Sequence, residues 1–450
     1  MRKFKLKSFF STVFILILAI SLAACAKSQT TSSPAPSTKA DSTPEAKKET
    51  KAKVEIVFQS WVTPNLTGEF YDGVIKAFEA ANPDIKVKRI QPPAADPNAD
   101  NYLKILLASG DFPDVISNAT TQTFVDADAL AEIAIDADVQ NIKNNMTSAI
   151  KGKLYNLSAT RQPQSLMFYN KKLFADAGIT ATPKSWAELM EVSAKLKAKN
   201  ITPLIVGGSE WPSGAVLSLM TAPTIFKSQQ TWYADRFEGK VKFTDPNWME
   251  AAAFYLELVD KGYFNKGALS TPYTEGEKLF LQGQGAMYPM GVWFTAAEAA
   301  AKKDFEVGVF AIPTKDGVPY IVGSENGGGL SISKKSKQPA AALKFAKFMT
   351  FDKDAVKQSL KADGNFSNLK EPILWDMTPL QKQISDVLNP LPPMVAHYNN
   401  KVGKDPVPGI ADQYNKVGQN LLLGTAGKVD LKKEMQSLDD YWDKTQKSMK

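Results

Sequence analysis

The sequence predicts an α/β protein made of two doubly wound units. Residues 53–116 alternate strand, helix, strand, helix and strand, which is the pattern of a parallel sheet covered by helices. Residues 166–312 repeat such an alternation over a similar length, and the segment RQPQS at 161–165 interrupts the pattern between the two. The 450 residues are enough for two or three domains with large buried cores.

Residues 1–24 have the features of a secretory signal peptide. The positively charged start MRKFKLK precedes an apolar run at 9–22, which is too short to span a bilayer comfortably. The Leu-Ala-Ala-Cys segment that ends at Cys25, the only cysteine, resembles the lipobox of bacterial lipoproteins. This resemblance implies that Cys25 is lipidated and anchors the protein to the extracellular face of the cell membrane. The alternative is an ordinary signal peptide that happens to contain a cysteine.

The composition is typical of a globular protein, with 44% hydrophobic and 22% charged residues. Four of the positive charges behind the net +7 belong to the signal peptide, so a nucleic-acid partner is not expected. Residues 25–52 are expected to comprise the lipidated cysteine and a disordered linker, because no large apolar residue occurs in them. A single cysteine excludes an intrachain disulfide.

Periodicity defines the elements of the first unit. Apolar and polar residues alternate in its strands, and apolar residues recur at helical spacing in its helices. The expected strands are 53–61, 85–90 and 112–116, and the expected helices are 68–81 and 100–109. Asn82-Pro83 should end the first helix, and Asp100 is a candidate N-cap of the second.

The second unit follows the same rules. Its expected strands are 166–169, 201–206, 285–290 and 305–312, and its expected helices are 170–178, 185–199, 247–261 and 275–282. Ser185 followed by Glu188 predicts a capping box at one of these helices. Further on, a Gly-rich loop opens into a strand within 321–333, and helices are expected at 339–349 and 429–448.

Four segments resemble the extracytoplasmic sugar-binding proteins of bacterial ABC importers, extracellular solute-binding protein family 1, which includes maltose-binding protein. They are 54–88, 100–133, 167–198 and the stretches 280–293, 305–313 and 327–349, in the order of the family. The Tyr-Asn-Lys sequence at 169–171, followed by Pro-Lys-Ser-Trp at 183–186, is the more specific part. Maltose-binding protein has an acidic residue at two positions where this sequence has Arg-Gln-Pro-Gln (161–164) and Thr121. The resemblance therefore leaves the identity of the sugar open.

The resemblance implies two α/β lobes joined by a multi-strand hinge, the type II arrangement of periplasmic binding proteins, with the ligand in the cleft between them. Lobe 1 would comprise 53–163 and 323–368, and lobe 2 would comprise 164–322 and 369–450. The chain would cross between the lobes near 161–166, 319–324 and 365–375. No cofactor or metal is implied, and the protein is expected to be a monomer.

Aromatic side chains are the first candidates for a sugar site, because a pyranose has an apolar face and a rim of hydroxyls. Loops at the carboxyl ends of strands line such a cleft, and Trp61, Trp211 and Trp293 follow expected strands. In the family, a tryptophan at the position of Trp293 stacks on sugar. Further possibilities are Trp232, Tyr233 and Trp375. Trp186 and Trp248 lie within helices and are assigned to the core.

Forked polar side chains supply the second set of candidates, since they can bind neighbouring hydroxyls. The candidates are Gln59, Asn65, Glu69, Thr121, Gln122, Gln164, Glu210, Glu325 and Asn326. Glu325 and Asn326 are favoured, because three glycines follow them and allow the backbone to approach a ligand. The alternative for each of these residues is solvated surface.

Three other patterns do not indicate a catalytic, metal or phosphate site. Asp114 is expected to bind local backbone and not to act as a catalytic acid. His397 is the only histidine, which excludes a His-rich metal site or a Cys-His pair. The glycines at 327–329 lack the Gly-Lys-Ser/Thr of a phosphate loop.

The sequence therefore favours a lipoprotein that captures a carbohydrate, with an oligosaccharide preferred, and delivers it to an ABC permease. One alternative is a binding protein for another solute, such as a peptide, glycerol phosphate or polyamine. The other is a secreted glycosidase with two carboxylates. The neutral and aromatic candidates favour sugar, and no paired acid and base marks an enzyme.

Overall fold

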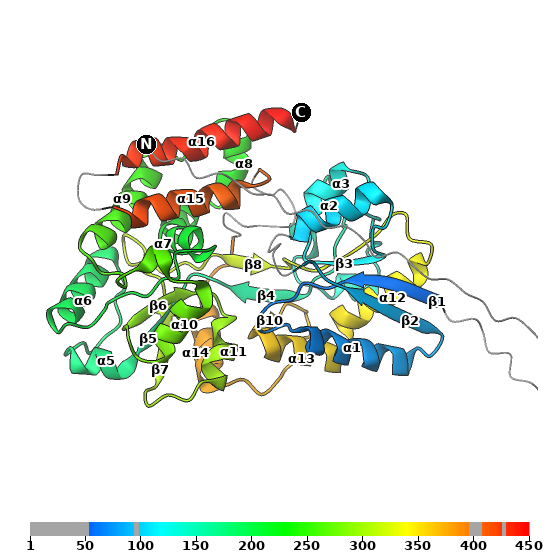
Figure 1. Ribbon diagram of the computed structural model, residues 1–450, viewed down its shortest axis with the longest axis horizontal. Helices are drawn as coiled ribbons and strands as arrows, with labels where there is room; N and C mark the ends of the chain where they lie inside the picture. The colour runs from blue at the N-terminus through cyan, green and yellow to red at the C-terminus, as the bar shows by residue number, and fades with distance from the viewer. Residues whose placement is uncertain (1–53, 94–98, 396–406, 425–428, 450) are drawn as a thin grey trace, which may run out of the picture. The chain divides into compact units, whose positions relative to one another are not determined.

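The computed structural model describes residues 54–93, 99–395, 407–424 and 429–449 (Figure 1). The expected signal peptide, Cys25, the linker and His397 lie outside the described residues. Three sheets organise the described part of the chain, in the strand orders β2-β1-β3-β9, β10-β4-β8 and β6-β5-β7.

The first sheet has the parallel core that the sequence predicts. Strand β1 pairs in parallel with β2 and β3, and β9 adds an antiparallel edge. The strands are β1 Val54–Gln59, β2 Ile85–Ile90, β3 Val115–Ser117 and β9 Leu330–Ile332. The associated helices are α1 Gly68–Ala81, α2 Ala99–Ser109, α3 Thr121–Asp126, α4 Ala137–Gln140, the 3₁₀ helix η1 Asn145–Ser148, α12 Pro339–Phe351 and α13 Lys353–Asp363.

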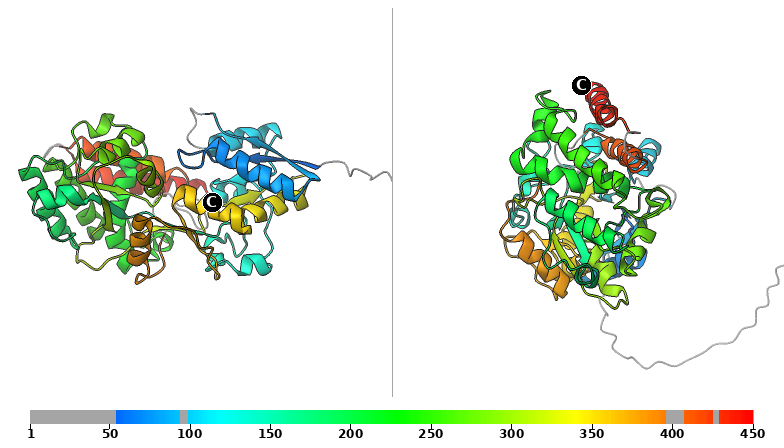
Figure 2. Two further views of the ribbon diagram at one scale, coloured as in Figure 1. Left: turned by 90° about the horizontal axis from the view of Figure 1, so that it is seen from below. Right: turned by 90° about the vertical axis from the view of Figure 1, so that its left-hand side faces the viewer.

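Helices α1 and α12 cover one face of this sheet and lie next to each other, blue and yellow in Figure 2 (left). Phe345 of α12 contacts both Phe58 of β1 and Phe78 of α1, with ring centroids 5.1 and 5.0 Å apart. All three rings are fully buried. This aromatic cluster joins the two segments of the chain that build the lobe, one containing β1 and α1 and the other containing α12.

Local signals explain where the elements of this lobe begin and end. Helix α1 has the predicted bounds, because Thr67 caps the amide of Phe70 and Asn82 ends the helix. The predicted N-cap at Asp100 was wrong: Asp100 lies inside α2, and its carboxylate accepts from the amide of Thr120 at 2.9 Å. Asp114 binds backbone, but not the local backbone that was expected: it accepts from the amide of Val57 in β1 at 2.8 Å.

The sheet of the second lobe is antiparallel around its central strand. Strand β5 Leu166–Asn170 pairs with β6 Met287–Met290 and β7 Val307–Ala311. The predicted strand at 201–206 was wrong, because only Leu204 forms bridges, to Phe264 and Met287. Pro203 has no amide hydrogen, and the amide of Val206 binds the Asn265 side chain, so no ladder extends along this segment.

Helices form most of the second lobe. They are α5 Lys171–Asp176, α6 Trp186–Ala198, α7 Pro212–Ser228, α8 Trp232–Phe237, α9 Pro246–Asp260, the 3₁₀ helix η2 Ala268–Ser270, α10 Tyr273–Leu281, α11 Phe294–Ala300, α14 Pro379–Leu388, α15 Ile410–Leu422 and α16 Leu431–Ser448. Ser185 caps the amide of Glu188 as predicted, but the Glu188 carboxylate accepts from the amide of Lys184.

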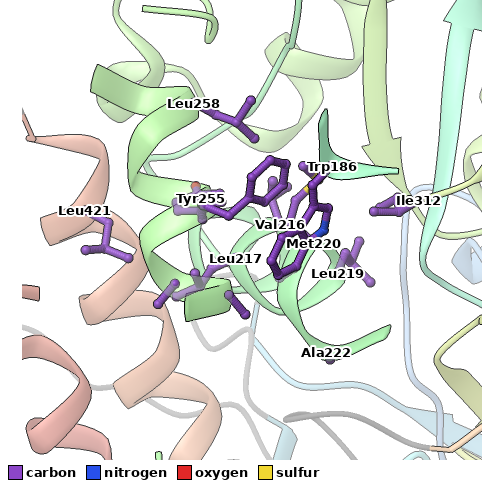
Figure 3. Close-up of a cluster of buried hydrophobic side chains, with 14 of the residues drawn as sticks. Trp186, Val216, Leu217, Leu219, Met220, Ala222, Tyr255, Leu258, Ile312 and Leu421 are labelled. Atoms are coloured by element: carbon purple, nitrogen blue, oxygen red, sulfur yellow. The ribbon is translucent and has the colours of Figure 1, made fainter. Parts of the chain in front are cut away.

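Helix α7 is the centre of this lobe and is buried along most of its length (Figure 3). A helix that is apolar on all sides is typical of such a position. Gly418 of α15 lies so close that a Cβ there would be 2.2 Å from the carbonyl oxygen of Ser213. The two helices therefore pack backbone against backbone, which needs glycine at the contact.

The buried tryptophans settle three of the expectations. Trp186 and Trp248 belong to the core around α7, as predicted. Trp232 is 0% exposed in the same core, so the suggestion that it lines a cleft was wrong. Trp375 packs on Val356 and Leu360, and Tyr233 stacks on Trp442.

The two last helices pack on the same core, side by side in Figure 2 (right). Asp439 of α16 accepts from the amides of Phe243 and Thr244 and from the Thr244 hydroxyl, and it pairs with Arg236 at 3.1 Å. Both charged side chains are almost fully buried. Such a pair is costly to break, so it fixes the last helix in one position.

Three short strands form the remaining sheet: β4 Thr160–Pro163, β8 Gly323–Glu325 and β10 Phe366–Ser367. Strand β4 is central and pairs antiparallel with both neighbours. Each strand overlaps one of the three segments where the chain was expected to cross between lobes, and the sheet lies between the other two in Figure 1. The fold is therefore two α/β lobes joined by a multi-strand hinge.

Candidate functional site

We call the sheet formed by β10, β4 and β8 the hinge sheet. Its two faces carry different polar clusters. In the register of β4 and β8, Arg161 lies opposite Glu325, and Gln162 lies opposite Ser324. Paired residues share a face and successive residues alternate. Arg161 and Glu325 therefore lie on one face, and Gln162 lies on the other.

On the Gln162 face, one carboxylate accepts hydrogen bonds from three amide side chains. Asp363 Oδ1 accepts from Asn65 Nδ2 at 3.2 Å, and Asp363 Oδ2 accepts from Gln162 Nε2 at 3.3 Å and Asn365 Nδ2 at 3.0 Å. Gln164 Nε2 donates to Gln162 Oε1 at 3.0 Å. We call these five residues the Asp363 cluster. It brings together the loop after β1, the strand β4 and the end of α13.

The charge of Asp363 has no cationic partner among the described residues. Burial raises the pKa of Asp363 to about 6, against the opposing effect of the three amide hydrogen bonds. Its side chain is nevertheless only half-buried by surface area. Asp363 is thus a partly exposed carboxylate with a raised pKa, and such perturbed groups concentrate at functional sites.

Aromatic rings lie beside the Asp363 cluster. Asn65 Nδ2 also donates to the carbonyl oxygen of Trp293 at 3.0 Å. The Trp293 ring lies 6.0 Å from that of Trp211, which lies 4.9 Å from the ring of Tyr273. All three aromatic side chains are half-buried, so each keeps an accessible surface.

Local sequence explains how these rings are placed. Trp211 and Trp293 are the residues immediately before α7 and α11, and each follows a glycine-containing turn. A Cβ at Gly291 would lie 2.1 Å from the Trp293 ring, so only glycine allows this ring position. Glu210 Oε2 accepts from the amide of Tyr273 at 3.1 Å, which ties the Trp211 turn to α10.

A second carboxylate borders the aromatic group. Glu277 lies 3.4 Å from the hydroxyl of Tyr273, and burial raises the pKa of Glu277. Burial, and then the neighbouring Glu277 charge, raises the pKa of Tyr273 well above its ordinary value. Tyr273 therefore stays neutral and presents a hydroxyl next to the two tryptophans.

Trp61 lies in the loop that supplies Asn65. Its carbonyl oxygen accepts from the Tyr71 hydroxyl at 2.7 Å, and its side chain is half-buried. Burial raises the pKa of Tyr71, and the charge of Asp363 contributes in the same direction. Tyr71 thus fixes the loop close to the Asp363 cluster.

The opposite face of the hinge sheet carries Glu325 and Asn326. Glu325 Oε1 pairs with Arg161 Nε at 3.1 Å and accepts from the amide of Met394 at 3.3 Å. Asn326 Nδ2 donates to the carbonyl oxygen of Lys143 at 2.8 Å, and Asn326 Oδ1 accepts from Asn368 Nδ2 at 2.8 Å. Asn144 Nδ2 joins the two groups by donating to Glu325 Oε2 at 3.4 Å. We call Arg161, Asn144, Glu325, Asn326 and Asn368 the Glu325 cluster.

The structure therefore divides the predicted site residues. Asn65, Gln164, Trp211, Trp293 and Glu210 lie in or beside the Asp363 cluster. Glu325 and Asn326 lie in the Glu325 cluster on the other face. Gln122 lies on α3, where its Nε2 donates to Asp126 at 2.8 Å.

Sequence reasoning missed Asp363, Gln162, Asn365, Tyr273 and Glu277. Asp363 precedes Gly364, so locally it looks like an ordinary helix end. Gln162 sits in the segment that was interpreted only as a break. Their meeting depends on the pairing of three distant strands, which no local pattern reveals.

Two properties of the described residues concern metal binding and membrane insertion. Among them, no group of three or more His, Cys, Asp or Glu side chains is placed to hold a metal ion. No helix in the described part of the chain is long and apolar enough to cross a membrane. The Asp363 cluster offers hydrogen-bonding groups, and the rings beside it offer aromatic surface.

Residues 63–356 match the family described as bacterial extracellular solute-binding protein. The chain belongs to this family. A multiple sugar-binding protein of Streptococcus mutans is 29% identical over 294 residues, which are 62% of this chain and 67% of that protein. An uncharacterised ABC transporter extracellular-binding protein of Pyrococcus horikoshii is 24% identical over 366 residues, 76% of this chain and 79% of its own.

Solved structures of solute-binding proteins share the fold. A chitin oligosaccharide binding protein superposes with a TM-score of 0.73 at 25% identity, covering 88% of this chain and 99% of its own. A sugar transporter protein from Bacillus licheniformis in complex with stachyose gives a TM-score of 0.69 at 19% identity, covering 87% and 100%. The second comparison concerns the fold alone.

Proposed function

We propose that this solute-binding protein captures a carbohydrate, of oligosaccharide size, at the Asp363 cluster and the adjoining aromatic rings, and delivers it to an ABC permease. One observation carries the proposal: the half-buried rings of Trp211, Tyr273 and Trp293 lie beside a polar cluster of amides and a carboxylate. Aromatic rings pack on the apolar face of a pyranose, and the amides and carboxylate bind its hydroxyls.

The hydrogen-bonding groups of this site support a neutral ligand. Asp363 and Glu277 are acceptors when ionised, and no lysine or arginine forms an ion pair with Asp363 among the described residues. A phosphate or carboxylate ligand would meet two negative charges here. Names of relatives and structural neighbours, including multiple sugar-binding protein and chitin oligosaccharide binding protein, point the same way.

Ligand capture would use the hinge. We place lobe 1 at 53–163 and 323–368 and lobe 2 at 164–322 and 369–450, with β4, β8 and β10 at the crossings. Asn65 of lobe 1 and Trp293 of lobe 2 meet at this site, so a ligand there touches both lobes. Binding to both lobes favours a closed state over an open one, which is the usual basis of hinge closure.

The test is thermal unfolding of the purified protein with a panel of solutes. Raffinose, stachyose, chitin oligosaccharides and xylo-oligosaccharides represent sugars, and sn-glycerol 3-phosphate, which one relative binds by name, represents a charged solute. A ligand at a hundred times its dissociation constant adds about 2.7 kcal/mol of stability. Stabilisation by a sugar that is recovered intact would support a binding protein that is not an enzyme. Stabilisation by the phosphate ester alone, or cleavage of the sugar, would contradict the proposal.

The proposal includes a lipid anchor at Cys25 on the extracellular face of the membrane, with the linker 25–52 as a spacer and the protein as a monomer. Two or more acyl chains would hold the protein stably on a bilayer. Cys25→Ser should move the protein from the membrane fraction to the medium or the soluble fraction. Unchanged membrane attachment of this variant would contradict the anchor and leave the sugar site untouched.

A further inference from the structure

The amides of the Asp363 cluster are held in one orientation by the carboxylate. An amide side chain has a donor end and an acceptor end, and an ionised carboxylate accepts only. Asn65, Gln162 and Asn365 each direct the NH₂ group to Asp363. Their carbonyl oxygens therefore point away from Asp363, and that of Gln162 accepts from Gln164 Nε2.

Two of these oxygens have no hydrogen-bond partner among the described residues. Asn65 donates to both Asp363 and the Trp293 carbonyl oxygen, so its two amide hydrogens are used, while its Oδ1 accepts nothing and its side chain is half-buried. Asn365 is 8% exposed, and its Oδ1 is buried without a partner. A buried unpaired acceptor costs free energy unless something donates to it.

Among the residues that the structure describes, the groups that bind the Asp363 carboxylate are neutral amides. The titratable groups that face it are Tyr71 from α1 and Tyr273 from α10, and burial raises the pKa of both hydroxyls, so they stay uncharged. On α13 itself, Lys361 is exposed. The strand β4 contributes Gln162, and the loop after β1 contributes Asn65. The three amides alone therefore compensate the charge.

We propose that ionised Asp363 is a positioning residue of the sugar site: it holds Gln162 and Asn365 in one orientation and Asn65 with its carbonyl oxygen available to a ligand hydroxyl, and protonation of Asp363 weakens sugar binding. This inference rests on the proposed function for its ligand. A protonated Asp363 is itself a donor, so at least one amide must turn its oxygen toward it and away from the ligand. Burial raises the pKa of Asp363 to about 6, so we expect the change in affinity around that pH.

The test has two readouts. The first is the Kd of the panel sugar that stabilises the protein most, measured by calorimetry at pH 5.0 and 7.5 for the native protein, Asp363→Asn, Asp363→Glu and the control Asp354→Asn. Asp354 lies on the same helix and is exposed. The second is the side-chain NH₂ resonances of Asn65 and Gln162 in the ligand-free protein, assigned with Asn65→Ser and Gln162→Ser and followed from pH 4.5 to 8.

We expect the native protein and Asp354→Asn to lose affinity about tenfold for a pH decrease of one unit below the Asp363 pKa. Asp363→Asn should bind at least tenfold more weakly at pH 7.5 and show no pH dependence. Asp363→Glu should restore part of both the affinity and the pH dependence, which a merely structural role would not do. Both NH₂ signals should shift with one midpoint near pH 6.

Equal affinities at both pH values in the native protein would overturn the inference, even if Asp363→Asn does not fold. Amide signals that do not follow a common titration would overturn it as well. If no sugar binds at any pH, the proposed function fails, and the amide titration of the ligand-free protein still decides whether Asp363 orients its neighbours.

Discussion

The Asp363 cluster and the Glu325 cluster lie on opposite faces of one three-stranded sheet and use the same kinds of side chain, yet their hydrogen bonding differs. In the Glu325 cluster the carboxylate has an arginine partner, and both ends of the Asn326 amide are bonded. In the Asp363 cluster the carboxylate has amide partners only, and Asn65 and Asn365 keep unused oxygens. The difference in hydrogen bonding is why we assign a structural role to the Glu325 cluster and propose the ligand site at the Asp363 cluster.

The largest effect should come from breaking the satisfied cluster. Glu325→Gln leaves Arg161 without its charged partner at a position where the Glu325 side chain is 7% exposed. We expect the free energy of unfolding to decrease by about 3 kcal/mol, as for other buried pairs that lose one member. Urea unfolding measures this change in the free energy of unfolding. Glu132→Gln, in an exposed pair with Lys153, serves as control and should change stability by less than about 1 kcal/mol.

The unsatisfied cluster should show the next effect, in the pH dependence of stability. The Asp363 pKa of about 6 lies above the unfolded value of roughly 3.9, so the folded state binds more protons between these values. The contribution of Asp363 to stability is therefore greatest below pH 4 and is lost as the pH rises through 6. We expect a decrease of about 2 kcal/mol over this range that is absent from Asp363→Asn. Parallel pH profiles of the two proteins would contradict the assignment.

The aromatic rings beside the Asp363 cluster should affect binding more than folding. Trp293→Ala removes a half-buried ring beside Trp211 and should weaken sugar binding by about 2 kcal/mol. Trp232→Phe, in the core of the second lobe, is the matched control and should lower stability without changing affinity by more than about twofold. Calorimetric titration measures both. Unchanged affinity in Trp293→Ala would place the ligand elsewhere.

The smallest effect should come from a single amide. Asn65→Ala removes hydrogen bonds to Asp363 and to the Trp293 carbonyl oxygen, and should weaken sugar binding by about 1 kcal/mol. Gln122→Ala removes a comparable amide on α3 that donates to Asp126. Equal losses of affinity in the two variants would show that the Asp363 cluster has no special role.

The sequence predicted elements well where local chemistry sets their bounds. Thr67 and Asn82 define α1, and the alternation of residues 85–90 gives β2 with its observed bounds. It failed where tertiary pairing decides, as at 201–206, where Pro203 and the side chain of Asn265 limit the ladder to Leu204. Asp100 looked like a cap because a cap and a helix-internal carboxylate have the same local pattern.

The candidate site was only partly predictable. Trp293 follows from the rule that strand ends line a cleft, because it comes after β6, and Asn65 follows from its position in the loop after β1. Trp211 was named by the same rule, but the strand expected before it does not form. Asp363 could not be found this way, because its three amide partners come from residues 65, 162 and 365. Glu325 and Asn326 look equally suitable in sequence, and only the alternation of the hinge strands separates the faces.

The central claim is that the Gln162 face of the hinge sheet binds carbohydrate and the Glu325 face does not. The most direct measurement is the calorimetric Kd, at pH 7.5, of the tightest-binding sugar of the panel for Asp363→Asn and Glu325→Gln side by side. The account predicts at least a tenfold loss of affinity in Asp363→Asn and at most about a twofold change in Glu325→Gln. Equal losses, or a greater loss in Glu325→Gln, would contradict it.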